Sequence, residues 1–442
     1  MPNEVLDTTC CIVGGGPAGM MLGYLLARAG VDVTVLEKHK DFNRDFRGDT
    51  VHPSTLQVIH ELGLLDEFLK IPHQELTQLG GVFGDFSFQT ADFRKMPTKC
   101  KFIALMPQWD LLNFFAEKAQ RFPSFRLLMQ HEAVDLLEHQ ERVTGVVAKR
   151  PKGMTEVNSH LVIGCDGRHS MTRSASHFEV MEFGVPIDVL WFRLPRVGND
   201  PERLLGNFNY GSALVLIPRG NYYQTGLLIR KGSFDQVKSL GIHAFQDKLR
   251  RIAPFLSERV DELKDWDDIK LLSVQINRLR KWHRPGLLCI GDAAHAMSPA
   301  GGVGINLAIQ DAVATANLLT ASLLRRRVTE ADLACVQRRR EFPTKATQAA
   351  QAMVHRQFAK MFNNSGPAKA PWQLKVIFQI PGIQRALARG VGMGVQPEHV
   401  ESLGAPRKNG MTLKRAAIAA GLLAAGAVLT MRLLTRRRFV TS

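Results

Sequence analysis

Residues 9–37 read TCCIVGGGPAGMMLGYLLARAGVDVTVLE, and the expected architecture follows from them. Residues 8–13 are a short β-branched and apolar run, and apolar residues at helical spacing begin at Pro17. A second apolar run, residues 31–36, ends on Glu37. A strand, a glycine-rich turn, a helix and another strand form the first unit of an α/β fold with a parallel sheet.

The glycines of this turn, Gly14, Gly16 and Gly19, have the G-x-G-x-x-G spacing of a dinucleotide-binding turn. The first glycine makes the bend, the second lets a pyrophosphate approach the backbone, and the third lets helix and strand touch. Pro17 suits the first helical turn, whose amide end attracts phosphate. Glu37 is placed to accept both ribose hydroxyls, which disfavours a 2′-phosphate. The unit therefore predicts FAD or NAD.

A second glycine-rich turn, GDAAHAMSPAGGVGINLAIQDA, occupies residues 291–312 after another apolar run. Asp292 follows the strand, at the edge where open α/β sheets bind ligands, and suits a ribityl hydroxyl. Glycines within residues 301–304 keep side chains away from a flat ring. The helix expected over about residues 303–319 directs its positive end at that ring and stabilises a reduced flavin. NAD has no such second pole, so the two turns favour FAD.

Two further segments add candidate contacts. GCDGRHSMTR, residues 164–173, follows a buried strand with an Asp166–Gly167 turn. Arg47, soon after the second strand, either folds back on the cofactor or lies on the surface, and its position alone does not separate these. Gln108 precedes an amphipathic helix.

The three motifs together resemble those of the class A flavoprotein monooxygenases, the family of p-hydroxybenzoate and phenol hydroxylases, over roughly the first 360 residues. The resemblance implies a Rossmann-like FAD-binding domain of the glutathione-reductase type, an interleaved β-sheet substrate domain and C-terminal helices. It implies tightly bound, non-covalent FAD, transient NAD(P)H, and a flavin hydroperoxide that hydroxylates an aromatic, polyketide-like or quinone-like molecule with O2. The residues that it places on the cofactor are Gly14, Gly16, Pro17, Ala18, Gly19, Glu37, Lys38, Arg47, Gln108, Asp166, Asp292, Pro299, Gly302, Gly304, Ile305 and Asn306. Gln108 departs from the arginine that many members have.

The expected domains are discontinuous. They comprise an FAD-binding domain of residues 1–75, 98–177 and 277–340, a β-sheet substrate domain of residues 76–97 and 178–276, a C-terminal helical region of residues 341–400, and a basic, weakly hydrophobic tail of residues 401–442.

The substrate cavity and the catalytic residue are less defined. The aromatic residues that are either cavity walls or ordinary core are Phe83, Phe86, Phe88, Trp191, Phe192, Tyr210, Tyr222 and Tyr223. The candidates for a proton acceptor are His295, Tyr222 and Tyr223, and His295 is better explained as a structural residue. No catalytic residue is assigned.

Charge and cysteine content bound the function further. The 442-residue chain has a formal net charge of +16 and six cysteines without C-x-x-C spacing, so we expect reduced cysteines and no metal site. Residues 401–442 hold eight Lys or Arg against one Glu, around the uncharged residues 416–431. A packed or mobile tail and a membrane-surface contact through residues 409–442 both remain open. We expect no nucleic-acid partner and a cytoplasmic protein, with a membrane-peripheral position as the alternative.

Other interpretations remain. Residues 372–390, WQLKVIFQIPGIQRALARG, are either a capping helix or a membrane-facing helix that admits a hydrophobic substrate. A flavin-dependent reductase or halogenase on the same scaffold is one alternative function, although residues 372–381 match a halogenase Trp-x-Trp-x-x-Ile-Pro segment poorly. A non-catalytic binding protein like the GDP-dissociation inhibitors is another, but it does without the ring-holding turn. The oligomeric state is not predicted.

Overall fold

The computed structural model describes residues 4–43, 50–198, 200, 206–363, 366–370 and 372–401, without the side chains of residues 373 and 374. Two sequence predictions lie outside the described residues: the Arg47 contact and, apart from residue 401, the basic tail.

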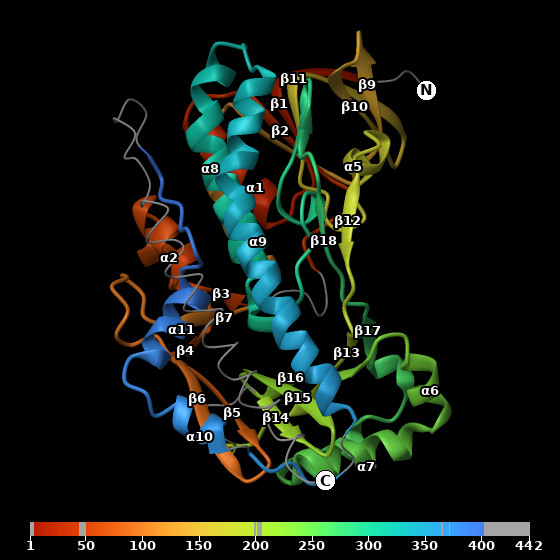
Figure 1. The fold of residues 1–442 in the computed structure, drawn as a ribbon. Coiled ribbons are helices and arrows are strands. Elements are labelled where there is room, and N and C mark those ends of the chain that lie inside the picture. Colours follow the sequence, from red (N-terminus) through yellow and green to blue (C-terminus); the bar gives the residue numbers. More distant parts are fainter. Residues whose placement is uncertain are drawn as a thin grey trace, which may run out of the picture.

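A mixed sheet with a parallel centre carries the cofactor motifs (Figure 1). Its main path runs β19, β20, β11, β1, β2 and β8, with the bounds His283–Arg284, Leu287–Cys289, Gly153–Gly164, Glu4–Val13, Val33–Glu37 and Phe125–Met129. Strand β1 pairs in parallel with β2 and β11, and β11 pairs in parallel with β20. The carboxyl ends of β1, β11 and β20 therefore meet at one edge, although they are far apart in sequence. Strands β9 (Glu132–His139) and β10 (Arg142–Arg150) extend β11 as an antiparallel meander.

Alternation along β1 divides the core of this domain into two layers. Cys10 and Ile12 face the helices α1 (Pro17–Arg28), α4 (Gln108–Ala119) and α8 (Gly304–Leu324). Cys11 and Val13 belong to the opposite layer, which contains β9, β10 and α5 (Met171–Ala175). Both faces are buried, as a parallel sheet requires.

A second, seven-stranded sheet forms the other half of the molecule. Its order is β17, β13, β16, β15, β14, β5 and β6, with the bounds Lys270–Leu272, Ile187–Pro195, Tyr222–Arg230, Ser212–Arg219, Gly206–Asn209, Gln78–Phe83 and Phe86–Asp92. Strands β5 and β6 come from the early insertion and join by a parallel pairing of β5 with β14. All the other pairings in this sheet are antiparallel.

Shorter elements complete the described chain. The small sheets are β3 (Thr50–Val51) with β7 (Ile103–Leu105) and β4 (Gln74–Leu76), and β12 (Val180–Phe183) with β18 (Ile276–Leu279). The other α-helices are α2 (Pro53–Glu61), α3 (Leu65–Phe68), α6 (Phe234–Ser239), α7 (Ile242–Ile252), α9 (Glu330–Met361), α10 (Trp372–Ile377) and α11 (Ile383–Gly392). The 3-10 turns are η1 (Pro254–Leu256), η2 (Val260–Glu262), η3 (Trp266–Asp268), η4 (Gly291–Ala293) and η5 (Ala300–Gly302).

Helix α9 connects the two halves, and α8 packs against it within the cofactor domain. Helix α8 is long and apolar enough to cross a bilayer by length and composition, but the apolar window is 78% buried, as in a core helix. Helix α9 begins at a capping box of Thr329 and Asp332 and runs from the cofactor domain to the second sheet (Figure 1). It continues through Pro343, so the predicted boundary between residues 340 and 341 falls inside one helix.

Candidate cofactor and substrate site

The β1–α1 turn has a different physical requirement at each of its three motif glycines. Gly14 has φ +105°, and a Cβ there would lie 2.5 Å from the carbonyl oxygen of Cys165. A Cβ on Gly19 would lie 1.9 Å from the carbonyl oxygen of Gly14, so the start of α1 touches the turn. A Cβ on Gly16 would meet no described atom within 4 Å. Gly16 therefore faces open space in front of the helix, whereas the other two are fixed by the fold.

Both helices that follow the glycine-rich turns begin without a side-chain cap. Helix α1 has Gly16 at its N-cap with Pro17 and Ala18 in its first turn, and α8 has Val303 at its N-cap followed by Gly304 and Ile305. Helix N-termini leave backbone N–H groups without intrahelical partners and carry partial positive charge. Each terminus is therefore suited to an electron-rich ligand group.

Glu37 is held at the end of β2. Its carboxylate accepts hydrogen bonds from the backbone N–H of Gly15 at 3.1 Å and of His39 at 3.0 Å. The side chain is buried beside the turn, and these bonds fix the carboxylate at the position predicted for ribose recognition. The neighbouring Lys38 has a 57% exposed side chain, whose ammonium lies 4.0 Å from the carboxylate of Glu132 on the surface.

The carboxyl ends of the paired strands β11 and β20 lie side by side at the edge of the sheet. Asp166 accepts hydrogen bonds from the backbone N–H and the hydroxyl of Thr172, both at 3.0 Å, and so anchors the start of α5. Asp292 is on η4, directly after β20. Its carboxylate lies 3.9 Å from the guanidinium of Arg168. Gln108 is the first residue of α4 and is half-buried.

The loop before α8 is shaped by two consecutive glycines and by contacts to α2. Gly301 and Gly302 have φ of +81° and +63°, which favour glycine, and a Cβ on Gly302 would lie 2.4 Å from the hydroxyl of Thr50. Asn306 accepts hydrogen bonds from the backbone N–H of His52 at 3.0 Å and the hydroxyl of Thr55 at 2.6 Å. Its amide therefore ties α8 to α2 in this structure, a structural role that the sequence did not indicate.

Helix α9 holds the same loop through a polar face that the sequence analysis missed. Gln351 accepts a hydrogen bond from the N–H of Ser298 and donates to the carbonyl oxygens of Ser298 and Ala300, at 3.1, 2.9 and 3.0 Å. Gln348 donates to the carbonyl oxygen of Ala296 at 3.1 Å. His355 Nε2 lies 2.8 Å from the hydroxyl of Ser298. Pro299, a predicted contact, is thus held between clamped residues.

His355 is buried, and burial lowers its pKa from 6.5 to about 4. It is therefore neutral near neutral pH. Its second ring nitrogen, Nδ1, is buried without a hydrogen-bond partner in the described part of the chain. Buried polar atoms normally have a hydrogen-bond partner, so this nitrogen is available to a partner from outside the protein.

A buried network of charged side chains lies behind the ring-side loop. His295 Nε2 is 2.6 Å from Asp311, whose other oxygen accepts a hydrogen bond from Arg340 at 2.8 Å. Arg340 also donates to Glu398 at 3.2 Å. Although burial raises the pKa of Asp311, His295 and Arg340 outweigh it and hold that pKa below its ordinary value. His295 therefore has a structural partner, in keeping with the interpretation preferred from sequence.

The two faces of the second sheet separate the predicted aromatic residues. Phe192 and Tyr223 lie in the core between this sheet and α7, so the second of the two interpretations, ordinary core, applies to them. Trp191 lies on the opposite face, in the cluster that includes Phe208 and Phe358. Neighbouring residues of a strand point to opposite faces, so Trp191 and Phe192 cannot both face the cofactor domain.

Six half-buried phenylalanines form what we call the phenylalanine array; they are Phe83, Phe86, Phe88, Phe208, Phe358 and Phe378. The Phe208 ring is stacked on that of Phe358, with centroids 5.9 Å apart and planes inclined by 11°. Phe208 also stacks on Phe88, which stacks on Phe378 at 5.3 Å. At the other end of the array, the centre of the Phe358 ring lies 6.5 Å from the centre of the His355 ring. The array therefore runs from the clamped loop to the end of α10. Phe83, Phe86 and Phe88, which the sequence left as either cavity walls or core, belong to it.

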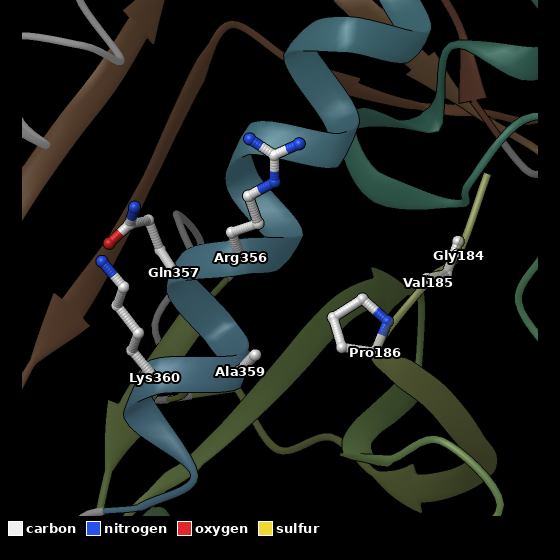
Figure 2. Close-up of a pocket in the computed structure, with 7 residues that line it drawn as sticks. All are labelled: Gly184, Val185, Pro186, Arg356, Gln357, Ala359 and Lys360. Atoms are coloured by element: carbon white, nitrogen blue, oxygen red, sulfur yellow. The ribbon is translucent and has the colours of Figure 1, made fainter.

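A separate hollow of about 630 Å³ lies between α9 and the chain before β13 (Figure 2). Its lining residues are Gly184, Val185, Pro186, Arg356, Gln357, Ala359 and Lys360. Arg356 and Lys360 give its α9 side a positive charge, and its other side is apolar. None of the predicted cofactor residues lines it, so we do not assign it to the cofactor.

These features fit FAD. The open space at Gly16 and the uncapped α1 accommodate a pyrophosphate, and Glu37 stands where the adenosine ribose follows. The second uncapped terminus, which follows Gly301 and Gly302, offers backbone N–H groups that suit the electron-rich edge of a flavin ring. In the described residues there is no group of three or more His, Cys, Asp and Glu arranged to hold a metal ion.

The sequence profile described as "FAD binding domain" matches residues 7–350. The chain belongs to the class A flavoprotein monooxygenases. It is an FAD-dependent monooxygenase, as the motif resemblance implied, and the expected α/β fold and cofactor are confirmed.

Individual comparisons agree with this family. The chain is 29% identical to 6-methylpretetramide 4-monooxygenase of Streptomyces rimosus, over 91% of this chain and 96% of that protein. OxyS anhydrotetracycline hydroxylase, also from Streptomyces rimosus, superposes with a TM-score of 0.67 and 20% identity, over 91% of this chain and 78% of that one. The flavin-dependent brominase Bmp2 superposes with a TM-score of 0.71 and 16% identity, over 96% and 99%. At these identities the two structures show a shared fold alone.

Proposed function

We propose that this monooxygenase uses NAD(P)H and O2 to hydroxylate a planar, fused-ring phenol of the aromatic polyketide type. The observation that supports it best is the phenylalanine array, which offers near-parallel apolar rings next to the loop that fits a flavin ring. Flat aromatic molecules bind well against such rings. The similarity to 6-methylpretetramide 4-monooxygenase over nearly the whole of both chains supports the same class.

Two buried polar atoms suit the oxygen atoms of such a substrate. His355 Nδ1 lies at the loop end of the array, and Trp191 Nε1 lies in the aromatic and aliphatic cluster on the same face of the sheet. Neither has a hydrogen-bond partner within the described residues. With Nε2 donating to Ser298, neutral His355 accepts a hydrogen bond at Nδ1, while the Trp191 indole donates one. We assign them to a substrate hydroxyl and a substrate carbonyl.

Different residues of the chain would then bind the cofactor, position the loop and bind the substrate. When bound, FAD supplies the oxidation of NAD(P)H and the activation of O2. Gly16, Glu37 and the start of α1 would bind its adenosine diphosphate half, and Gly301, Gly302 and the start of α8 would hold its ring. Gln351 and His355 keep the loop in place, and the array excludes water from the reacting centre. The hydrogen bond from the substrate hydroxyl to His355 makes the phenol more nucleophilic.

The test is a panel of phenols of increasing ring number, assayed for NAD(P)H consumption and for transfer of one labelled oxygen atom from O2 to product. We expect fused tricyclic and tetracyclic phenols to accelerate NAD(P)H oxidation and to gain the label. Equal rates for monocyclic and tetracyclic phenols would contradict the proposed substrate class. Halide incorporation without oxygen transfer would instead support the halogenase alternative.

A matched pair of variants ties this activity to the array. Phe208→Leu shortens the stacked ring on the cofactor-facing side, whereas Phe192→Leu makes the same change in the core on the other side. We expect Phe208→Leu to raise KM for the tetracyclic substrate about tenfold, the equivalent of 1.4 kcal/mol, which is near the upper value for an aromatic pair. Phe192→Leu should lower stability and leave KM unchanged. The opposite pattern would place the substrate elsewhere.

A further inference from the structure

The outer surface of the C-terminal helices combines large apolar side chains with cations. Trp372, Val376 and Ile380 are 56, 48 and 45% exposed. Trp372 and Val376 lie on α10, and Ile380 lies between α10 and α11. Lys375 on α10 and Arg385 and Arg389 on α11 are also exposed. We call these six residues the α10–α11 surface. Exposed apolar side chains that gather on one surface and are rimmed by charged residues mark a site that a partner or a membrane covers.

The segment of sequence around this surface is strongly basic. Residues 342–397 contain seven Lys or Arg and no Asp or Glu, which gives these 56 residues a charge of +7. The positive residues are Lys345, Arg356, Lys360, Lys369, Lys375, Arg385 and Arg389. A partner that covers the surface must therefore be negatively charged and must also accept apolar side chains.

The surface lies directly outside the phenylalanine array. Phe378, one turn after Lys375, stacks on Phe88 of β6 at 5.3 Å. The Lys375 ammonium lies 5.4 Å from the centre of the Phe86 ring. Helices α10 and α11 lie beside β5 and β6 at the lower left of Figure 1, at the end of the molecule away from β9 and β10. An apolar molecule that left the partner here would meet the array next.

We propose that the α10–α11 surface docks on an anionic lipid bilayer. Tryptophan prefers the headgroup region, aliphatic side chains enter the acyl boundary, and lysine and arginine pair with acidic headgroups. A folded acidic protein matches the charge but gives no equal reason for the exposed Trp372 and Ile380. The phenylalanine array then has a second role, as the path by which an apolar substrate reaches the loop from the membrane.

The test uses the full chain and flotation with vesicles of phosphatidylcholine, with or without phosphatidylglycerol. We expect binding to the anionic vesicles only, and a decrease of about tenfold or more in the partition coefficient for the triple variant Trp372→Ser, Val376→Ser, Ile380→Ser. The charge reversal Lys375→Glu, Arg385→Glu, Arg389→Glu should reduce it at least as much. Flavin content and thermal unfolding of each variant report that it folds.

Two matched controls make the result specific. Arg325→Glu, Arg326→Glu, Arg327→Glu reverses three exposed cations after α8 and changes the net charge equally. Leu240→Ser removes a 70% exposed leucine next to α7. Neither control should alter binding by more than about twofold, because neither lies on the α10–α11 surface. If the surface variants bind as well as the unaltered chain, binding resides elsewhere, for example in the basic tail, and the proposal fails. Equal binding to uncharged vesicles, or no binding to any vesicle, also overturns it.

Discussion

A substitution at Gly16 is expected to change cofactor binding without disturbing the fold. Its φ of −74° and ψ of −174° suit any residue, and a Cβ there meets no described atom within 4 Å. Gly16→Ala should therefore leave the free protein as stable as before, or more stable by up to about 1 kcal/mol, because alanine restricts the unfolded chain. The added methyl group instead occupies the space in front of α1 where a pyrophosphate must approach.

The expected cost falls on FAD affinity. Losing one hydrogen bond between a backbone N–H and a phosphate costs about 1.5–3 kcal/mol, which corresponds to roughly 10- to 140-fold weaker binding. Titration of the flavin-free protein, followed by flavin fluorescence, measures this directly. Thermal unfolding of the same flavin-free samples measures the stability. Gly184→Ala is the matched control, since Gly184 also meets no described atom within 4 Å and lies outside the turn.

Gly19→Ala should behave differently, because its Cβ would lie 1.9 Å from a backbone oxygen. We expect it to destabilise the flavin-free protein by about 1–3 kcal/mol or more, since α1 must move away from the turn. Unchanged FAD affinity in Gly16→Ala, relative to Gly184→Ala, would refute the assignment of the α1 terminus to the pyrophosphate. Equal destabilisation by Gly16→Ala and Gly19→Ala would refute the reasoning from packing.

Two other variants test the structure around the ring-side loop. Burial lowers the pKa of His355 from 6.5 to about 4, so on acidification the imidazole takes up a proton in the unfolded chain before it does so in the folded protein. The contribution of His355 to the free energy of unfolding is therefore full above about pH 6.5 and is lost as the pH drops toward 4, by up to about 3 kcal/mol. His355→Gln should flatten that part of the curve of unfolding free energy against pH, and an unaltered curve would contradict the buried neutral state. Arg340→Met leaves buried Asp311 and Glu398 without a shared cation, and we expect a loss of about 3–5 kcal/mol in urea unfolding; Arg339→Met, half-exposed beside Glu398, is the milder comparison.

The glycine-rich turns were predictable because their requirements are local. The bend at Gly14 and the close approach at Gly19 depend on a few neighbouring residues, and their spacing encodes both. The position of Asp292 at the carboxyl edge of the sheet followed from a general property of parallel sheets, since strand ends of one direction share one edge.

The remaining parts of the site depend on which side of an element faces inward. The polar residues of α9, such as Gln351 and His355, resemble a solvated helix face in the sequence, and only the packing of α9 on the loop buries them. Trp191 and Phe192 are adjacent and equally apolar, so alternation predicts two faces without telling which one meets the cofactor domain. The side-chain bonds of Asn306 to α2 join residues about 250 positions apart, which no local pattern encodes.

The two glycine-rich turns are assigned to one ligand that is held at both ends, with adenosine at the α1 turn and the ring at the α8 terminus. Parallel titrations of the flavin-free protein with FAD and with FMN, which lacks the adenosine half, test this most directly. We predict that FAD binds one per chain and that FMN binds at least about a hundredfold more weakly, because it leaves the contacts at Gly16 and Glu37 unmade. Equal affinity for the two flavins, or no binding of either, would contradict the account.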